Sequence, residues 1–152
     1  MGWGDAMKSC AFFGHRQGNY SPEEEKLRDI LIELIENEGV TQFYAGGRGD
    51  FDRFCASVVA TLKKKYPQIR MTLVLSYIPK EKEEYTSFCY DDSVYLLERQ
   101  VPKRFAIIET NKAIVDRVDF VVSGTKLSFG GAATAVEYAR KRTRVIDLYE
   151  GE

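Results

Sequence analysis

The sequence has few of the residues that build metal sites and disulfide frameworks. It holds a single histidine and three widely spaced cysteines, so neither a zinc-ligand pattern nor a disulfide framework follows. Cys10 and Cys55 fall on apolar stripes, and we expect both to be small core residues. We therefore expect no metal site and no resident cofactor.

An excess of charge of one sign is also missing. The chain has 22 basic and 23 acidic residues, for a net charge of −1. It has no overall basic field that would attract nucleic acid or an anionic membrane, so neither is an expected partner. The apolar runs are far shorter than the ~20 residues of a membrane span, and the N-terminus has no signal-peptide core. We expect a cytoplasmic protein.

The composition that remains is that of a compact domain. Hydrophobic residues make up 44% and charged residues 30% of the 152 residues. A chain of this length fits one domain, which buries roughly 70% of the surface that its unfolded chain exposes. We expect residues 1–7 to form a flexible leader and residues 8–152 to form a single domain.

Short runs that favour strands alternate with runs that favour amphipathic helices. The clearest helix is Pro22–Glu38, with Ser21 as its expected N-cap and Gly39 at its end. The alternation predicts an α/β fold in three layers, with a mainly parallel five-stranded sheet of order 3-2-1-4-5. The expected strands are Lys8–Phe13, Thr41–Ala45, Arg70–Ser76, Asp119–Ser123 and Arg144–Leu148, and the other expected helices are Phe51–Lys65, Arg104–Arg117 and Ala132–Arg142.

The segment Tyr77–Pro102 interrupts this alternation. It combines a charge run with several aromatic residues, and we expect one short helix near Asp91–Leu97. It is either a solvated excursion with a few aromatic side chains packed on the core, or a lid or dimer contact.

Two glycine-rich segments, Tyr44–Asp50 and Phe129–Thr134, carry most of the functional signal. Each lies where a strand gives way to a helix, so its backbone N–H groups are exposed at a helix start. That arrangement suits an anion, above all a phosphate. Two copies in one short chain indicate a nucleotide-like ligand. The glycines that we expect to contact it are Gly46, Gly47, Gly49, Gly130 and Gly131.

Gly14, His15 and Arg16 follow the first expected strand, next to the predicted switch point between the first and fourth strands. Ligands of open parallel sheets bind at such a point. Arg16 can pair with a phosphate through its planar guanidinium group. His15 is expected either to contact the ligand or to have a structural role.

Two further polar residues have more than one interpretation. Asp52 favours the dipole of its helix, accepts a ribose hydroxyl, or locks the glycine turn by accepting from its amides. Asn111 lies on the stripe Arg104, Ile107/Ile108, Asn111, Ile114/Val115 and Val118, which we expect to face inward. It therefore either holds a loop carbonyl or reaches the ligand pocket, because an unpaired buried amide would cost ~1–3 kcal/mol.

Thr134 and Glu137 are three residues apart and so share a face of the last helix, above Gly130 and Gly131. A phosphate would repel the Glu137 carboxylate, so this group should serve another part of the ligand. Its expected targets are ribose hydroxyls or a glycosidic carbon that develops positive charge. Otherwise Glu137 is a surface residue of the first helical turn.

Several of these segments together resemble the YpsA-like bacterial proteins. They are Cys10–Arg16, Phe43–Asp52, Asn111–Asp119 and the Gly130-Gly131 pair. YpsA-like proteins belong to the SLOG superfamily, which is named for the DNA-processing Smf/DprA proteins and the Lonely Guy (LOG) enzymes. The resemblance covers nearly the whole chain after Met7. It implies a Rossmann-like fold that binds nucleotides or nucleotide-derived ligands.

The spacing of Gly130, Gly131, Thr134 and Glu137 is similar to the hallmark of LOG enzymes, which cleave the N-glycosidic bond of nucleoside 5′-monophosphates. Asn111 stands where those enzymes have an arginine, so a bidentate phosphate donor is missing. Our leading hypothesis is a sensor or binding protein for a nucleoside monophosphate, an ADP-ribose or an NAD-like molecule. The alternative is a LOG-like phosphoribohydrolase in which Glu137 is catalytic. LOG relatives pair, so the resemblance also implies a homodimer.

Overall fold

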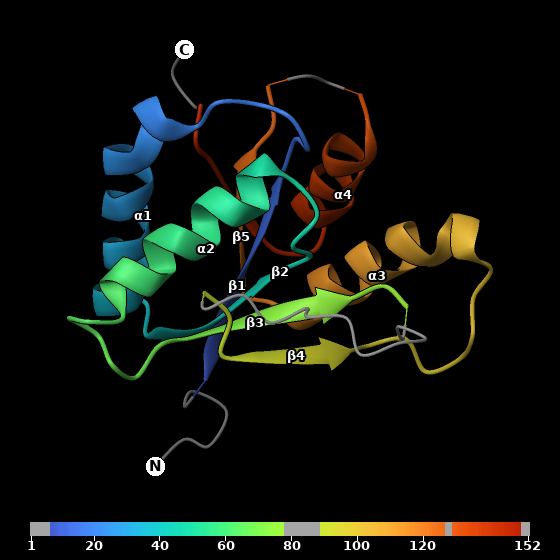
Figure 1. Cartoon of the computed structure of the whole chain (residues 1–152), viewed down its shortest axis with the longest axis horizontal. Coiled ribbons are helices and arrows are strands. Elements are labelled where there is room, and N and C mark those ends of the chain that lie inside the picture. The colour runs from blue at the N-terminus through green and yellow to red at the C-terminus, as the bar shows by residue number, and fades with distance from the viewer. Residues whose placement is uncertain (1–6, 78–88, 127–128, 150–152) are drawn as a thin grey trace.

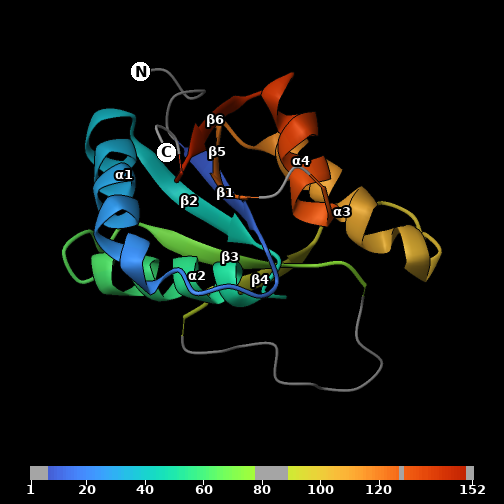
Figure 2. The same cartoon turned by 90° about the horizontal axis from the view of Figure 1, so that it is seen from above.

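The computed structural model describes residues 7–77, 89–126 and 129–149. A central parallel sheet separates two helical layers (Figures 1 and 2), with α1 and α2 on one face and α3 and α4 on the other. The α/β class and the layered Rossmann-like arrangement predicted from the sequence are confirmed. None of the described helices is long and apolar enough to cross a membrane.

The sheet has six strands in the order β4-β3-β2-β1-β5-β6, all parallel. Five of them lie in the predicted order, 3-2-1-4-5. The sixth, β4, adds to the edge next to β3. The strands are β1 (Lys8–Gly14), β2 (Val40–Ala45), β3 (Arg70–Leu75), β4 (Asp92–Tyr95), β5 (Phe120–Gly124) and β6 (Arg144–Asp147).

The prediction of a short helix near Asp91–Leu97 is wrong, because β4 occupies this segment. Asp91 joins it to β3: its backbone N–H donates to Met71 O (2.8 Å), and its carboxylate accepts from Met71 N (2.8 Å). The same carboxylate pairs with Lys63. Pairing with the open edge of β3 satisfies backbone groups on both strands, which outweighs local helix preference. Residues 78–88 of the predicted excursion and residues 1–6 of the predicted leader lie outside the described residues.

The helices differ from prediction mainly at their ends. The first begins with a 3-10 turn, η2 (Ser21–Glu23), so Ser21 lies inside the helical segment and is not its N-cap as predicted. The turn leads into α1 (Glu24–Asn37), and Gly39 follows with a positive φ of 75°. The other helices are α2 (Asp50–Leu62), α3 (Lys103–Arg117) and α4 (Gly131–Arg140).

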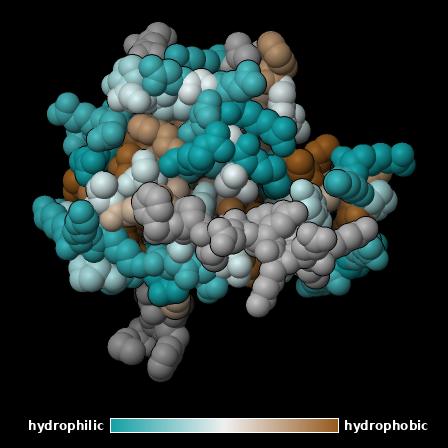
Figure 3. Space-filling model, in the orientation of Figure 1, coloured by the Kyte–Doolittle hydropathy of each residue, from teal (hydrophilic) through white to brown (hydrophobic). Residues whose placement is uncertain are grey.

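The two faces of the sheet carry separate cores. The larger core, beneath α1 and α2, includes Phe12, Phe43, Leu31 and Met71, and the rings of Phe12 and Phe43 stack with centroids 5.8 Å apart. The smaller core, beneath α3 and α4, includes Val121 and Ile114. The molecular face seen in Figure 3 is mainly hydrophilic, and its hydrophobic side chains form small separate patches.

The ring of Phe51 connects α2 to the carboxyl ends of two strands. Gly14 of β1 and Gly124 of β5 are paired in the sheet, and a Cβ at either position would lie well inside van der Waals contact of this ring. Phe51 is fully buried and meets the ring of Tyr20 edge to face, 4.8 Å between centroids. The Tyr20 hydroxyl donates to Gly124 O and accepts from His15 N, both at 3.1 Å. Glycine at both strand ends is therefore a packing requirement.

We predict that Gly124→Ala destabilises the protein by about 3 kcal/mol, because the added methyl group overpacks a closed site. Gly131→Ala is the matched control: a Cβ there meets open space, so the expected change is below about 0.5 kcal/mol. Urea unfolding followed by circular dichroism measures both changes. Adding Phe51→Leu to Gly124→Ala should recover part of the loss. Equal stability of the two alanine variants would contradict this packing.

Candidate functional site

A cavity of about 330 Å³ lies at the carboxyl edge of the sheet. We call it the carboxyl-edge cavity. Its walls come from the loop after β1, the glycine turn after β2, the middle of α3 and the start of α4. Because β2 and β5 flank β1 on opposite sides, the cavity lies at the predicted switch point of the sheet. The lining residues are Phe12–Arg16, Gly46, Arg48, Gly49, Asp52, Ile107, Asn111 and Phe129–Ala132.

Most residues expected to bind ligand come together here. Those that line the cavity are Gly14, His15, Arg16, Gly46, Gly49, Asp52, Asn111, Gly130 and Gly131. Gly47, Thr134 and Glu137 are outside the lining. The Thr134 hydroxyl donates to Gly130 O (3.0 Å), so it closes the first turn of α4, and Glu137 is exposed on the same helix.

Arg48, Ile107 and Phe129 also line the cavity, although none of them was expected to contact a ligand. Arg48 lies inside the glycine-rich segment Tyr44–Asp50, and this position could have indicated a contact with the ligand. Phe129 precedes the second glycine pair and is 70% exposed, so it offers an aromatic surface at the rim. Nothing in the local sequence around Ile107 distinguishes it from a core residue.

α3 is rotated about its axis relative to the prediction, so its inward face differs from the expected one. Its buried residues are Ala106, Thr110, Ile114 and Val115, whereas Arg104 and Ile108 are exposed. Asn111 is half-buried and lines the cavity, one of the two positions considered for it. Within the described part of the chain, its side chain has no hydrogen bond to protein, so the amide is available to a ligand.

The backbone groups around the glycine turn after β2 are largely occupied. The amide of Arg48 donates to Asp52 Oδ2 (3.2 Å), and that of Gly47 also bonds this carboxylate. At the start of α2, the amides of Asp50 and Phe51 donate to Arg16 O (2.8 Å) and His15 O (3.4 Å). Asp52 therefore locks the turn, one of the roles considered for it. The loop after β1 takes the place that an anion would have at this helix.

Close approach of two loops makes this arrangement possible. A Cβ on Gly49 would collide with the backbone of Arg16, so only glycine lets the loop after β1 lie against the start of α2. The side chain of Asp50 also accepts from Gly18 N (3.0 Å), which adds a second link to the same loop. These contacts set the position of Arg16 at the cavity.

The glycine turn before α4 is open. Gly130 has a φ of 103°, and a Cβ at Gly130 or Gly131 would meet no atom of the described residues within 4 Å. Among the described residues, no side chain caps this helix. The first amides of α4 have no partner within the helix, because an α-helix leaves its first N–H groups unpaired. Together with the positive end of the helix dipole, they favour an anion at this side of the cavity.

Two arginines supply positive charge. Arg16 is exposed at the cavity, and Arg48 is half-buried with its guanidinium group donating to the hydroxyl of Ser76. Burial lowers the pKa of Arg48, the nearby Asp52 opposes that shift, and the charge of Arg16 adds to it. The two guanidinium groups are thus close enough to interact, and an anion between them would relieve their repulsion.

Among the titratable groups that line the cavity, Asp52 has the shifted pKa that best indicates a functional role. Burial raises its pKa to about 6, although the amides of Arg48 and Gly47 and the guanidinium of Arg48 favour its charged form. A carboxyl group with a perturbed pKa inside a cavity is typical of functional sites. It can accept a hydrogen bond from a ligand hydroxyl, or donate one when it is protonated.

His15 connects two loops at the cavity. Its Nε2 accepts from the backbone N–H of Lys126 (2.9 Å), so it fixes the loop that follows β5. This bond supports a structural role for the single histidine, and its position in the lining keeps ligand contact open. The thiols of Cys10 and Cys55 are buried, and burial raises both pKa values, which makes them poor nucleophiles.

Comparisons with known proteins establish the fold. No protein-family model and no curated protein matches the sequence. The similar solved structures include DNA processing protein A (DprA) from Streptococcus pneumoniae, with a TM-score of 0.66 at 16% identity over 94% of this chain and 50% of that one. This chain therefore spans about half the length of that DprA.

Two further solved structures share the fold. TM1055 matches with a TM-score of 0.57 at 20% identity, over 95% of this chain and 75% of that one. The molybdenum cofactor carrier protein of Chlamydomonas reinhardtii matches at 0.52 and 14% identity, over 93% of this chain and 75% of that one. The chain thus shares a Rossmann-like fold with these proteins, as the sequence predicts.

We predict that Asp52→Asn stabilises the protein above pH 6 by up to about 3 kcal/mol. The raised pKa of Asp52 means that the folded state binds its proton more tightly than the unfolded state. Its contribution is therefore present below about pH 4 and is lost as the pH rises through 6. Melting temperatures of both proteins between pH 4 and pH 8 measure the difference, which should grow with pH.

Asp50→Asn is the matched control for this experiment. Bonds from Gly18 N and the Arg53 side chain lower the pKa of Asp50, so its charged form contributes stability that is lost as the pH falls. Asp50→Asn should therefore destabilise the protein at neutral pH, opposite in sign to Asp52→Asn. The same pH trend in both variants would rule out a specific effect of the environment of Asp52.

Proposed function

We propose that this chain binds a nucleotide-derived ligand, such as a nucleoside monophosphate, an ADP-ribose or an NAD-like molecule, as a sensor or binding protein. One observation carries the proposal: the uncapped start of α4 and the guanidinium of Arg16 border the same cavity at the switch point of the sheet. Free amides, a helix dipole and a fixed cation together favour a phosphate group.

The phosphate binds at Gly130 and Gly131, with Arg16 as its main counter-charge and Arg48 behind it. The glycine turn after β2 has a different role in this proposal, because Asp52 already accepts from its amides. The turn instead holds Asp52 against the ligand, where the carboxylate accepts a ribose hydroxyl. The Asp52 carboxylate lies close to the two arginines and would repel a phosphate bound by them, so it contacts the sugar instead.

The remaining lining suits the sugar and the base. Asn111 provides both a donor and an acceptor, and Ile107 and Phe129 provide apolar surface. An aromatic ring at the rim offers a face on which a base can stack. A cavity of about 330 Å³ is at the lower end of the range for ligand pockets, so it accommodates a nucleoside monophosphate or one half of a dinucleotide.

The wider family supports a binding role. We propose that the chain is a YpsA-like member of the SLOG superfamily, on the motifs described above. The structural neighbours include a carrier of the molybdenum cofactor and a Helicobacter pylori DprA with a single-stranded DNA binding mode. The near-neutral charge of this chain favours a small ligand over DNA. By resemblance to LOG enzymes, we also propose a homodimer, which light scattering coupled to size exclusion measures.

We predict that Arg16→Gln weakens binding of AMP or ADP-ribose about tenfold, because it removes a charge-assisted hydrogen bond to phosphate. Calorimetric titration measures the affinity. Arg53→Gln is the control: Arg53 is an exposed cation on α2 outside the cavity, and its loss should leave affinity unchanged. Adenosine should bind more weakly than AMP, and a single-stranded oligonucleotide should not compete. Equal affinity of adenosine and AMP would overturn the phosphate site.

The alternative function is N-glycosidic hydrolysis with Glu137 as the catalytic carboxylate, which the spacing of Gly130, Gly131, Thr134 and Glu137 favours. Binding without cleavage has more support, because Glu137 is exposed and is not part of the cavity lining. We predict that AMP remains intact when incubated with the protein. Chromatography for released adenine tests this, and release that is lost in Glu137→Gln would establish the hydrolase instead.

A further inference from the structure

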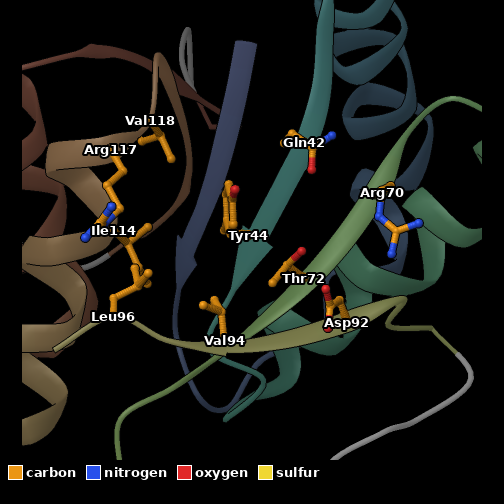
Figure 4. Close-up of a pocket in the computed structure, with 10 residues that line it drawn as sticks. All are labelled: Gln42, Tyr44, Arg70, Thr72, Asp92, Val94, Leu96, Ile114, Arg117 and Val118. Atoms are coloured by element: carbon orange, nitrogen blue, oxygen red, sulfur yellow. The ribbon is translucent and has the colours of Figure 1, made fainter. Parts of the chain in front are cut away.

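The sheet carries a second hollow on its α3 side, separate from the carboxyl-edge cavity. It has a volume of about 270 Å³ and shares no described lining residue with that cavity. Tyr44, Thr72 and Val94 contribute its floor from β2, β3 and β4, and Ile114 of α3 forms its wall. Arg70 and Arg117 complete this set, which we call the sheet-face groove. Figure 4 shows the three floor residues on adjacent strands, with Ile114 and Arg117 on the α3 side.

The groove exists because α3 and α4 cover only part of their face of the sheet. On the opposite face, Phe43 and Met71 of the same strands are fully buried beneath α1 and α2. On the α3 side, Val74 of β3 is apolar and buried, but the positions of β2 and β3 that line the groove are polar: Gln42 and Tyr44, then Arg70 and Thr72. A face that only packed against a helix would carry apolar residues at these positions.

The polar groups of the floor have no protein partners. Thr72 is only 8% exposed and Tyr44 is half-buried, yet within residues 7–77, 89–126 and 129–149 neither hydroxyl has a hydrogen bond to protein. Hydroxyls in such positions have to be satisfied by water or by a bound molecule. They provide two hydrogen-bonding groups next to the apolar side chains of Val94 and Ile114.

The groove also carries two arginines. Among the described residues, neither Arg70 nor Arg117 has an ion pair within 4.0 Å. Asp92 is the acidic residue of the lining, and one of its carboxylate oxygens accepts from Ser93 N (2.8 Å). Both arginines are exposed, and the charge of Arg70 also acts on the nearby carboxylate of Asp91. An anion is the complementary charge.

We propose that the sheet-face groove binds a small planar organic acid, such as an aromatic carboxylate. Its carboxylate pairs with Arg117 or Arg70, its ring lies against Val94 and Ile114, and the hydroxyls of Tyr44 and Thr72 hold its polar edge. A volume of about 270 Å³ accommodates one or two fused rings. This site is independent of the phosphate site proposed above.

The test uses sodium 2-naphthoate as the probe and amide chemical shifts of the isotope-labelled protein as the readout. Naphthoate should shift the amides of Tyr44, Thr72 and Val94 and leave those of Gly46 and Gly131 unchanged. Uncharged 2-naphthamide should bind about tenfold more weakly, because it lacks the charge-assisted hydrogen bond. AMP should not displace naphthoate.

Variants separate this site from non-specific binding. Arg117→Gln and Arg70→Gln are surface changes, and at least one should weaken naphthoate binding about tenfold. Arg28→Gln on α1, on the opposite side of the sheet, is the matched control and should leave it unchanged. The proposal is overturned if naphthamide binds as tightly, if AMP displaces naphthoate, if neither groove variant weakens binding, or if no shifts occur at concentrations on the order of 10 mM.

Discussion

The packing of one aromatic ring against two strand ends holds the functional half of this molecule together. Phe51 can enter only because Gly14 and Gly124 have no side chains. Tyr20 packs on the Phe51 ring, and its hydroxyl bonds Gly124 O and the backbone N–H of His15, directly after β1. This contact fixes α2 relative to β1 and β5. The loop after β1, the glycine turn after β2 and the loop after β5 are therefore held in a constant relation.

The two glycine-rich turns that look equivalent in the sequence have opposite roles in the fold. The first is internally satisfied, since Asp52 and the carbonyls of His15 and Arg16 take its amides and those of α2. At the second, no side chain of the described residues caps the helix start. In the proposed function, this difference decides where the phosphate binds and leaves the Asp52 carboxylate for the rest of the ligand.

Strand order and the position of the site could be predicted because both follow from local patterns. Apolar runs separated by amphipathic helices define a parallel sheet, and its switch point brought Gly14, Arg16, Gly46 and Gly130 to one cavity. The edge strand β4 was missed because its four residues acquire their conformation from pairing with β3. The partners of the Asp50 and Phe51 amides could not be predicted either, because each amide donates to a carbonyl of the loop after β1, which is distant in the sequence.

The connectivity of the sheet also has a consequence for synthesis of the chain. β1 lies inside the sheet, between β2 and β5. Its residue Cys10 pairs with Phe43 of β2 on one side and with Phe120 of β5 on the other. During translation the first contact can form early, whereas the second waits until β5 has left the ribosome. Until then one edge of a largely apolar strand has no neighbour, and such edges attract other nascent chains. Chaperones that recognise extended apolar segments would therefore meet this protein before its central strand is closed.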